Sequence, residues 1–256
     1  MSSLASRVYP VIKPVARVLY PLMYRGGGRF CPICAGRFSS FAPYGAAGTA
    51  KRPDARCPRC FTLERHRLVF RFFEEKTDLH DGRPKRLLHV APEESLESLF
   101  RRAVGDGYHS GDLFHPRAME KMDICDIRHD DNTFDVIYCS HVLEHVPDDR
   151  RAIAEFLRVL KPGGWAILNV PIMGDKTFED PEVTDPKERL RVFGQSDHVR
   201  RCGPDYPDRI REVGFDVRVY KPKDIVSESD LTRLGVSTKH AGDVYYCTKP
   251  SPQATA

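Results

Sequence analysis

The chain has 256 residues, of which 41% are hydrophobic and 10% aromatic, and its formal net charge is +4. This composition excludes an intrinsically disordered chain, and we find no run of about 18 apolar residues that would span a membrane. The length suits one α/β domain with a small appendage.

The basic charge is concentrated at the start of the chain. Residues 1–53 contain eight Lys and Arg side chains and no Asp or Glu. Such a segment either favours anionic partners, such as lipid headgroups, nucleic acid or a phosphorylated substrate, or packs against the acidic remainder of the chain. Three prolines interrupt the apolar part of residues 1–28, so we expect a cytoplasmic protein without a signal peptide. Residues 8–24 are a candidate for peripheral membrane contact.

Two Cys-x-x-Cys pairs follow, Cys31 with Cys34 and Cys57 with Cys60, separated by 22 residues. Each pair brings two thiolates to one ion, and the two pairs complete a tetrahedral site that suits zinc. The alternative is two disulfides, which a reducing cytosol disfavours. We predict a zinc ribbon and its following helix over residues 29–77, with a structural Zn²⁺ because no coordination position is left open.

Residues 61–73 are apolar-periodic and predict a helix. Its charged residues Arg65, His66 and Arg67 either face a ligand or form a solvated face with an internal ion pair, and we favour the solvated face. Residues 78–84 form a polar linker.

The region 86–170 indicates one half of an open α/β sheet. Residues 86–91 form a short apolar strand that stops at Pro92. The next strand, residues 110–114, carries Asp112 at its end, where an acidic residue of a Rossmann-like sheet accepts hydrogen bonds from ribose hydroxyls.

A further apolar strand, residues 132–141, delivers Ser140 and His141 to the same edge of the sheet. A helix follows, and residues 160–164 break it before the strand at residues 165–170. Two later segments, residues 215–220 and 243–248, alternate like an antiparallel pair.

Four segments together resemble class I S-adenosylmethionine-dependent methyltransferases: SGDL at 110–113, FDVI at 134–137, HVLEHV at 141–146 and RVLKPGG at 158–164. Their order and spacing are more specific than any one of them. The resemblance covers residues 84–250. It implies a Rossmann-like α/β fold with a seven-stranded sheet, closed by the antiparallel pair, and S-adenosylmethionine as cofactor.

The first loop departs from the family pattern. The family's Asp-x-Gly-x-Gly lets the backbone approach the methionine part of the cofactor, whereas this chain has His89, Ala91 and Glu93 at those positions. Either the chain holds the cofactor through a different loop, which we favour, or the site is degenerate.

The resemblance implies cofactor contacts from ten residues. Asp126 and Ile127 match the loop that meets the adenine amino group in relatives, although Asp126 or Asp123 could instead cap a turn. The complete predicted set is His89, Ala91, Pro92, Glu93, Asp112, Leu113, Asp126, Ile127, Ser140 and His141.

His141 and His145 lie four residues apart at the predicted start of a helix and would share a face. His141 stands where the family places residues near the transferred methyl group. A neutral imidazole there can accept a proton from a hydroxyl or amine nucleophile. Alignment alone can also carry methyl transfer, because the sulfonium is already a good leaving group.

Residues 171–207 form a long polar insertion, which we predict to be a substrate lid. Asp197, His198 and Arg200 are its candidates for binding or base chemistry, and His198 joins His141 as a candidate catalytic residue. The alternative is a surface excursion in which His198 caps a helix.

The leading hypothesis is methyl transfer to a small-molecule acceptor with an oxygen or nitrogen nucleophile. An RNA base methyltransferase that binds RNA through the zinc module is the second, since basic side chains track phosphates. We see no Asn-Pro-Pro-Tyr-like segment to hold a flipped base. The third is a non-catalytic zinc-bearing scaffold. The acceptor atom and the oligomeric state stay open.

Overall fold

The computed structural model describes residues 19–45 and 51–251, so most of the basic N-terminal segment lies outside the described residues. The chain divides into two compact units. The first comprises the described residues up to Asp78 together with Lys221–Gly242, and the second comprises Leu79–Tyr220 with the residues from Asp243 onward. Residues 221–242, which fall inside the range 84–250 expected from the resemblance, thus belong to the first unit.

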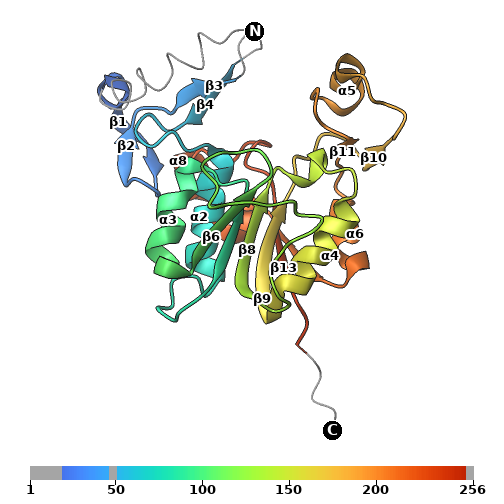
Figure 1. The fold of residues 1–256 in the computed structure, drawn as a ribbon. Helices are drawn as coiled ribbons and strands as arrows, with labels where there is room; N and C mark the ends of the chain where they lie inside the picture. The colour runs from blue at the N-terminus through green and yellow to red at the C-terminus, as the bar shows by residue number, and fades with distance from the viewer. Residues whose placement is uncertain (1–18, 46–50, 252–256) are drawn as a thin grey trace. The chain divides into compact units, whose positions relative to one another are not determined.

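The second unit is built on a seven-stranded sheet (Figure 1). Its strand order is β12-β13-β9-β8-β5-β6-β7. The five strands from β9 to β7 are parallel, and β13 is antiparallel to both of its neighbours. The predicted α/β fold with an antiparallel closing pair is therefore confirmed. The strands are β5 (Leu87–Val90), β6 (Tyr108–Asp112), β7 (Glu120–Lys121), β8 (Phe134–Ser140), β9 (Leu160–Asn169), β12 (Asp216–Tyr220) and β13 (Val244–Thr248).

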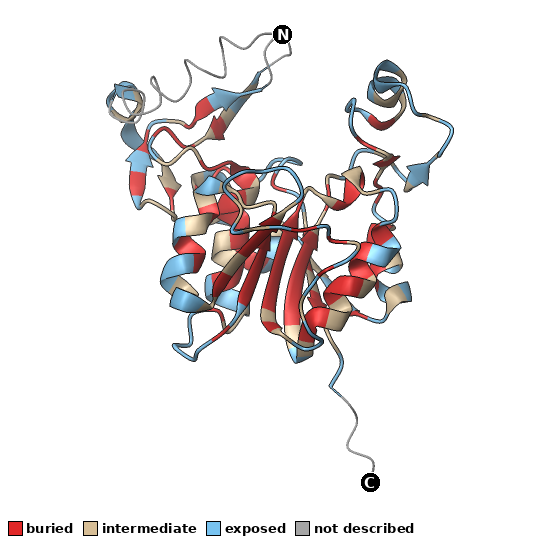
Figure 2. Cartoon of the chain, viewed as in Figure 1, coloured by how far each residue is buried: buried red, intermediate tan, exposed pale blue. Residues whose placement is uncertain are grey.

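Helices cover both faces of this sheet, with α3 on one side and α4 and α6 on the other (Figure 1). Strands covered on both faces should be apolar throughout, and all four residues of β5 and six of seven in β8 are buried (Figure 2). The helices and turns are α3 (Glu94–Val104), η1 (Gly105–Gly107), η2 (Leu143–His145), α4 (Asp149–Val159) and α6 (Tyr206–Val213).

The insertion 171–207 has secondary structure of its own. Strand β10 (Phe178–Glu179) pairs with β11 (Arg200–Arg201), and α5 (Pro186–Phe193) lies between them. Asp185 caps α5 by accepting hydrogen bonds from the backbone N–H groups of Lys187 and Glu188.

A buried arginine fastens the insertion to the segment between β8 and α4. Arg200, 1% exposed, donates from Nη1 to the carbonyls of Leu143 and Val146, and from Nη2 to the carbonyl of Pro147. Its Nε donates to Glu179. The predicted role of Arg200 in binding or base chemistry is not supported, because its donors are used within the fold.

A second set of contacts reinforces this attachment. The buried carboxylate of Asp149 accepts hydrogen bonds from Tyr206 and from Arg209, which also binds Glu179. Burial raises the pKa of Glu179, but hydrogen bonds from Arg209 and Arg200 outweigh it and hold that pKa below its usual value.

The described residues of the first unit form two antiparallel strand pairs and several short to medium helices, including a helical stretch at residues 19–23. One hairpin pairs β1 (Arg25–Cys31) with β2 (Gly36–Phe38), and the other pairs β3 (Ala42–Tyr44) with β4 (Arg52–Arg56). Its other helices are α2 (Glu64–Lys76), α7 (Pro222–Ile225) and α8 (Glu228–Arg233). No described helix in either unit is long and apolar enough to cross a membrane.

Arg67 on α2 corrects the expectation of a solvated charged face. Its side chain is 0% exposed and lies 3.8 Å from the ring centroid of Phe41. It donates hydrogen bonds to the backbone carbonyls of Ala55, Thr62 and Leu234. The guanidinium therefore ties a hairpin, the start of α2 and the returning segment into one unit.

We expect Arg67→Met to lower the free energy of unfolding by about 3 kcal/mol, since buried carbonyls would lose their donors. Arg71→Met is the matched control on the same helix, because Arg71 pairs with Glu74 and Glu75 one turn away on the helix surface. Its cost should stay below about 1 kcal/mol. Urea unfolding of both variants measures the difference, and equal costs would contradict the structural role of Arg67.

Candidate functional site

A cavity of about 620 Å³ lies in the second unit at the carboxyl ends of β5, β6 and β8. Ligands of open α/β sheets bind in this position, outside the strand ends. Its lining is mainly apolar, with a few polar groups: Val90, Ala91, Asp112, Leu113, Phe114, Met122, Asp123, Ile124, Cys125, His141, Val142, His145, Val146, Pro147 and Asp197.

The turn after β5 adopts the backbone conformation that glycine would favour. Ala91 has φ +48°, in the left-handed region, and its N–H donates to the carbonyl of Gly111 at 2.9 Å. At position 91, where the family has glycine, this chain adds only a methyl group. The turn thus keeps the expected backbone path and reaches the cavity wall.

His89 points away from the cavity. Its ring is 0% exposed, packs edge-on against Phe100 and Tyr138, and bonds Tyr108 Oη through Nδ1 at 3.1 Å. Its Nε2 accepts the N–H of Glu93 at 3.2 Å. His89, which stands where the family has Asp, therefore supports the turn from within the core, and direct cofactor contact by the His89 side chain is not supported.

Pro92 and Glu93, also predicted cofactor residues, do not line the cavity. Glu93 is the N-cap residue of α3, and its carboxylate lies 3.5 Å from the hydroxyl of Tyr138. These contacts make Glu93 part of the scaffold of the turn.

Asp112 lies at the end of β6 and lines the cavity. Its Oδ1 accepts hydrogen bonds from the N–H groups of Phe114 (2.7 Å) and His115 (2.5 Å), which fixes the carboxylate. Oδ2 takes no part in these bonds, so it can accept from a ligand. Leu113, the next residue, supplies apolar wall.

The residues predicted to contact adenine, Asp126 and Ile127, lie just after the residues of this segment that line the cavity. Asp126 is exposed, and Ile127 is buried with its N–H donating to Glu155, so neither lines the cavity. The wall is formed instead by Asp123, Ile124 and Cys125. The sequence missed this because residues 122–127 belong to no regular helix or strand, and Asp123 Oδ1 accepts the N–H of Cys125 in a turn.

His141 lines the cavity, but it does not begin a helix as predicted. It has φ +59° and follows β8, while η2 spans Leu143–His145 and α4 starts only at Asp149. Ser140 is buried, and its Oγ lies 3.0 Å from His141 Nδ1, so Ser140 orients the ring rather than facing the cavity.

A cluster of ionisable side chains stands at one edge of the cavity, formed by Glu144, His145, Asp197 and His198. The His145 and His198 rings meet at 4.7 Å, and His145 Nδ1 lies 3.4 Å from Asp197 Oδ2. His198 is 3% exposed and does not line the cavity, so direct base catalysis by His198 is not supported. Burial and the nearby His145 lower the pKa of His198, which favours its neutral form.

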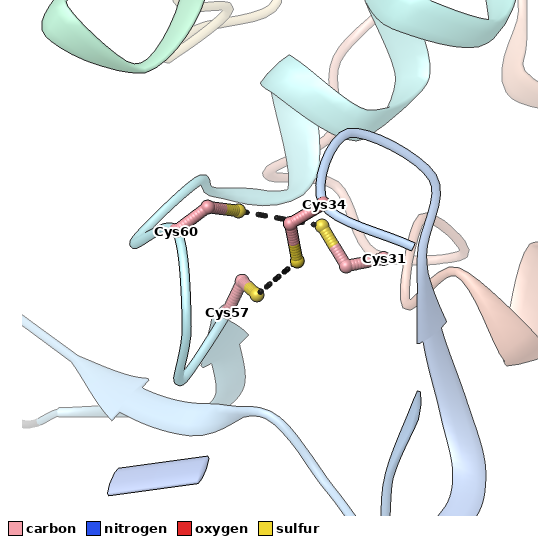
Figure 3. A group of neighbouring side chains, drawn as sticks. All are labelled: Cys31, Cys34, Cys57 and Cys60. Carbon is pink, nitrogen blue, oxygen red and sulfur yellow. Dashed lines mark hydrogen bonds between the residues drawn. The ribbon is translucent and has the colours of Figure 1, made fainter. Parts of the chain in front are cut away.

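The four predicted metal ligands of the first unit come together (Figure 3). The sulfur atoms of Cys31 and Cys60 are 3.5 Å apart and those of Cys34 and Cys57 3.6 Å, and one sulfur from each cysteine lies within 4.8 Å of all the others. All four are free cysteines, so the disulfide alternative is absent here. Hydrogen bonds from Cys34, then Cys57 and Cys60, lower the pKa of the Cys31 thiol.

The left-handed conformation of Ala91 yields a testable expectation. Ala91→Gly should raise the free energy of unfolding by about 0.5–1 kcal/mol, because glycine adopts this conformation without strain. Ala91→Val should lower it by more than that, because a β-branched side chain is poorly tolerated at positive φ. Urea unfolding measures both, and a loss of stability on Ala91→Gly would contradict the strained turn.

Comparison with known proteins shows what the part of the chain that lines this cavity is similar to. Residues 91–168 match the family model described as a methyltransferase domain. The matched residues include the ends of β6 and β8, and the match agrees with the resemblance to methyltransferases described from the sequence.

Individual proteins resemble parts of the chain. Sterol 24-C-methyltransferase of Schizosaccharomyces pombe is 31% identical over 118 residues, covering 44% of this chain and 28% of that protein. Ubiquinone biosynthesis O-methyltransferase of Thiobacillus denitrificans is 47% identical over 45 residues, covering 18% of this chain and 19% of that protein. The chain thus spans less than a third of either relative.

Among solved structures, phosphoethanolamine N-methyltransferase 2 of Haemonchus contortus in complex with S-adenosyl-L-methionine has a TM-score of 0.49 at 15% identity. That similarity covers 73% of this chain and 53% of the solved chain.

Proposed function

We propose that the chain is a methyltransferase that uses S-adenosylmethionine to methylate an oxygen or nitrogen atom of a small-molecule acceptor. The observation that supports this most directly is the cavity at the ends of β5, β6 and β8, which stays open although His89, Ala91 and Glu93 replace the family's usual residues. His89 turns into the core, and only Ala91 of the three reaches the wall.

The polar residues of the wall suit the parts of the cofactor. Asp112 would accept hydrogen bonds from the ribose hydroxyls through Oδ2, since Oδ1 is held by the loop after β6. Asp123 and the backbone of Ile124 would meet the adenine edge, with Met122 and Val146 supplying apolar contact. When bound, the cofactor supplies a methyl group on a cationic sulfur.

In this proposal His141 would lie away from the ribose end of the cofactor. Asp112 ends β6 and His141 follows β8, and these strands flank β5, so the two residues are separated by about 10 Å, two strand spacings. An acceptor beside His141 would therefore lie near the methyl end of a cofactor held by Asp112. His141 would align the acceptor and could take its proton as the nucleophile attacks.

Asp112→Asn should weaken binding of S-adenosylhomocysteine by about 10-fold or more, because a neutral amide replaces the carboxylate acceptor while its carbonyl can still hold the loop. Asp126→Asn is the matched control, since Asp126 is exposed and outside the cavity. Calorimetric titration measures both. Equal affinities would contradict the assignment of Asp112, and a wild-type protein that binds no cofactor at millimolar concentration would favour the non-catalytic scaffold.

We also propose that the four cysteines bind one structural Zn²⁺. Four thiolates this close repel one another unless a cation sits among them, and a four-cysteine set is characteristic of closed tetrahedral zinc sites. The hydroxyl of Thr62 lies 3.1 Å from the sulfur of Cys60, where it can donate to a thiolate. The ion would hold the β1–β2 turn against the segment before α2.

Replacing zinc with Co²⁺ tests this site by its spectrum, because cobalt bound by thiolates gives intense charge-transfer absorption in the near ultraviolet. Cys57→Ser should abolish most of this absorption and unfold the hairpins. Cys125→Ser, a half-buried cysteine of the second unit, should leave the absorption unchanged. Unaltered absorption in Cys57→Ser, or none in the wild type, would contradict the zinc site.

A further inference from the structure

A second group of metal-ligating side chains occurs in the second unit. Glu144, His145 and His198 each offer one ligand atom, and these atoms lie within 4.8 Å of one another. Two imidazoles and one carboxylate form a donor set that binds divalent first-row transition metals and leaves coordination positions open.

The cluster is largely buried, and one ring nitrogen of His198 has no hydrogen-bond partner in the described part of the chain. Glu144 is 1% exposed and His198 3% exposed. Nδ1 of His198 is buried and has no hydrogen-bond partner among the described residues. A buried ring nitrogen left in this state costs free energy, and an ion between these side chains would remove that cost.

The fold holds these ligands in place from both sides. The N–H of Val199 donates to the carbonyl of Glu144 at 2.9 Å, which sets His198 beside the η2 turn. Arg200 then binds three carbonyls of the segment 143–147. Asp197 lies 3.4 Å from Nδ1 of His145, as an outer carboxylate does when it orients a metal-bound imidazole through the opposite nitrogen.

We propose that Glu144, His145 and His198 bind one divalent transition-metal ion at the edge of the cavity, and that the ion binds the acceptor through an oxygen atom. His145 belongs both to this cluster and to the cavity wall, so the proposal requires that an open coordination position be reached from the cavity. The acceptor class is then a molecule with a hydroxyl group that can coordinate a metal, such as a vicinal diol or a catechol.

This choice of acceptor rests on the proposed function, while the metal site does not. A metal-bound hydroxyl loses its proton to water more readily than a free one. The resulting oxygen anion forms the bond to the methyl carbon as the carbon–sulfur bond breaks, and that electron pair stays on sulfur. The products are the methyl ether, S-adenosylhomocysteine and the released proton.

The test titrates Co²⁺ into the full-length protein with zinc already in the cysteine site. We expect one further equivalent of Co²⁺ to bind, with weak visible absorption and without the intense thiolate charge-transfer band. His145→Ala should weaken this binding at least 10-fold. His145 is the variant of choice because it is half-buried and its loss threatens the fold less than that of Glu144.

His129→Ala is the matched control, since His129 pairs with the single carboxylate of Glu120 at 2.8 Å and belongs to no three-ligand group. The His129→Ala variant should bind the second equivalent of metal, Co²⁺, as tightly as the wild type does. Binding of no second equivalent, or equal binding by wild type and His145→Ala, would overturn the metal site. Calorimetric titration of the same samples with S-adenosylhomocysteine tests the proposed function separately. Asp112, and not this cluster, is expected to bind the cofactor, so loss of Co²⁺ binding need not change the affinity for S-adenosylhomocysteine.

Discussion

The turn after β5 is the constraint on which the site depends. The backbone must leave a parallel strand and pass the cavity wall without a side chain filling the space. Here the turn does so with Ala91 in the left-handed region and with His89 folded into the core beneath it. The imidazole bonds Tyr108 on one side and the backbone of Glu93 on the other, so it stiffens a turn that glycines would leave flexible.

The opposite wall of the cavity is fixed by a different interaction. Arg200 comes from the insertion and saturates carbonyls of the β8–α4 segment, while Asp149 binds Tyr206 and Arg209. The insertion is thus joined to the domain by buried charge-assisted hydrogen bonds, which are strong and directional. These bonds hold β11, at one end of the insertion, to the β8–α4 segment.

The first unit uses the same principle with fewer residues. Its hairpins bury little apolar surface, and small units of this kind need a metal or similar crosslink. The cysteine cluster supplies the ligands for one, and Arg67 connects the hairpins to α2 and to the returning segment 221–242 through backbone carbonyls. Each unit therefore contains a buried arginine that donates to several backbone carbonyls, and Arg200 also binds the carboxylate of Glu179.

The sequence by itself determined the features that depend on local order and spacing. The strand patterns gave the parallel sheet, the end of β6 gave Asp112 at the cavity, and the paired cysteines gave a four-sulfur cluster.

The tertiary structure alone decided which way His89 points, because both faces of a buried strand are apolar and the pattern cannot distinguish them. It also decided that the cavity wall follows Asp123 rather than Asp126, since an irregular turn has no periodicity to read. The sequence likewise does not show that Glu144 and His145 meet His198, because more than 50 residues separate them and tertiary contacts of Val199 and Arg200 bring them together.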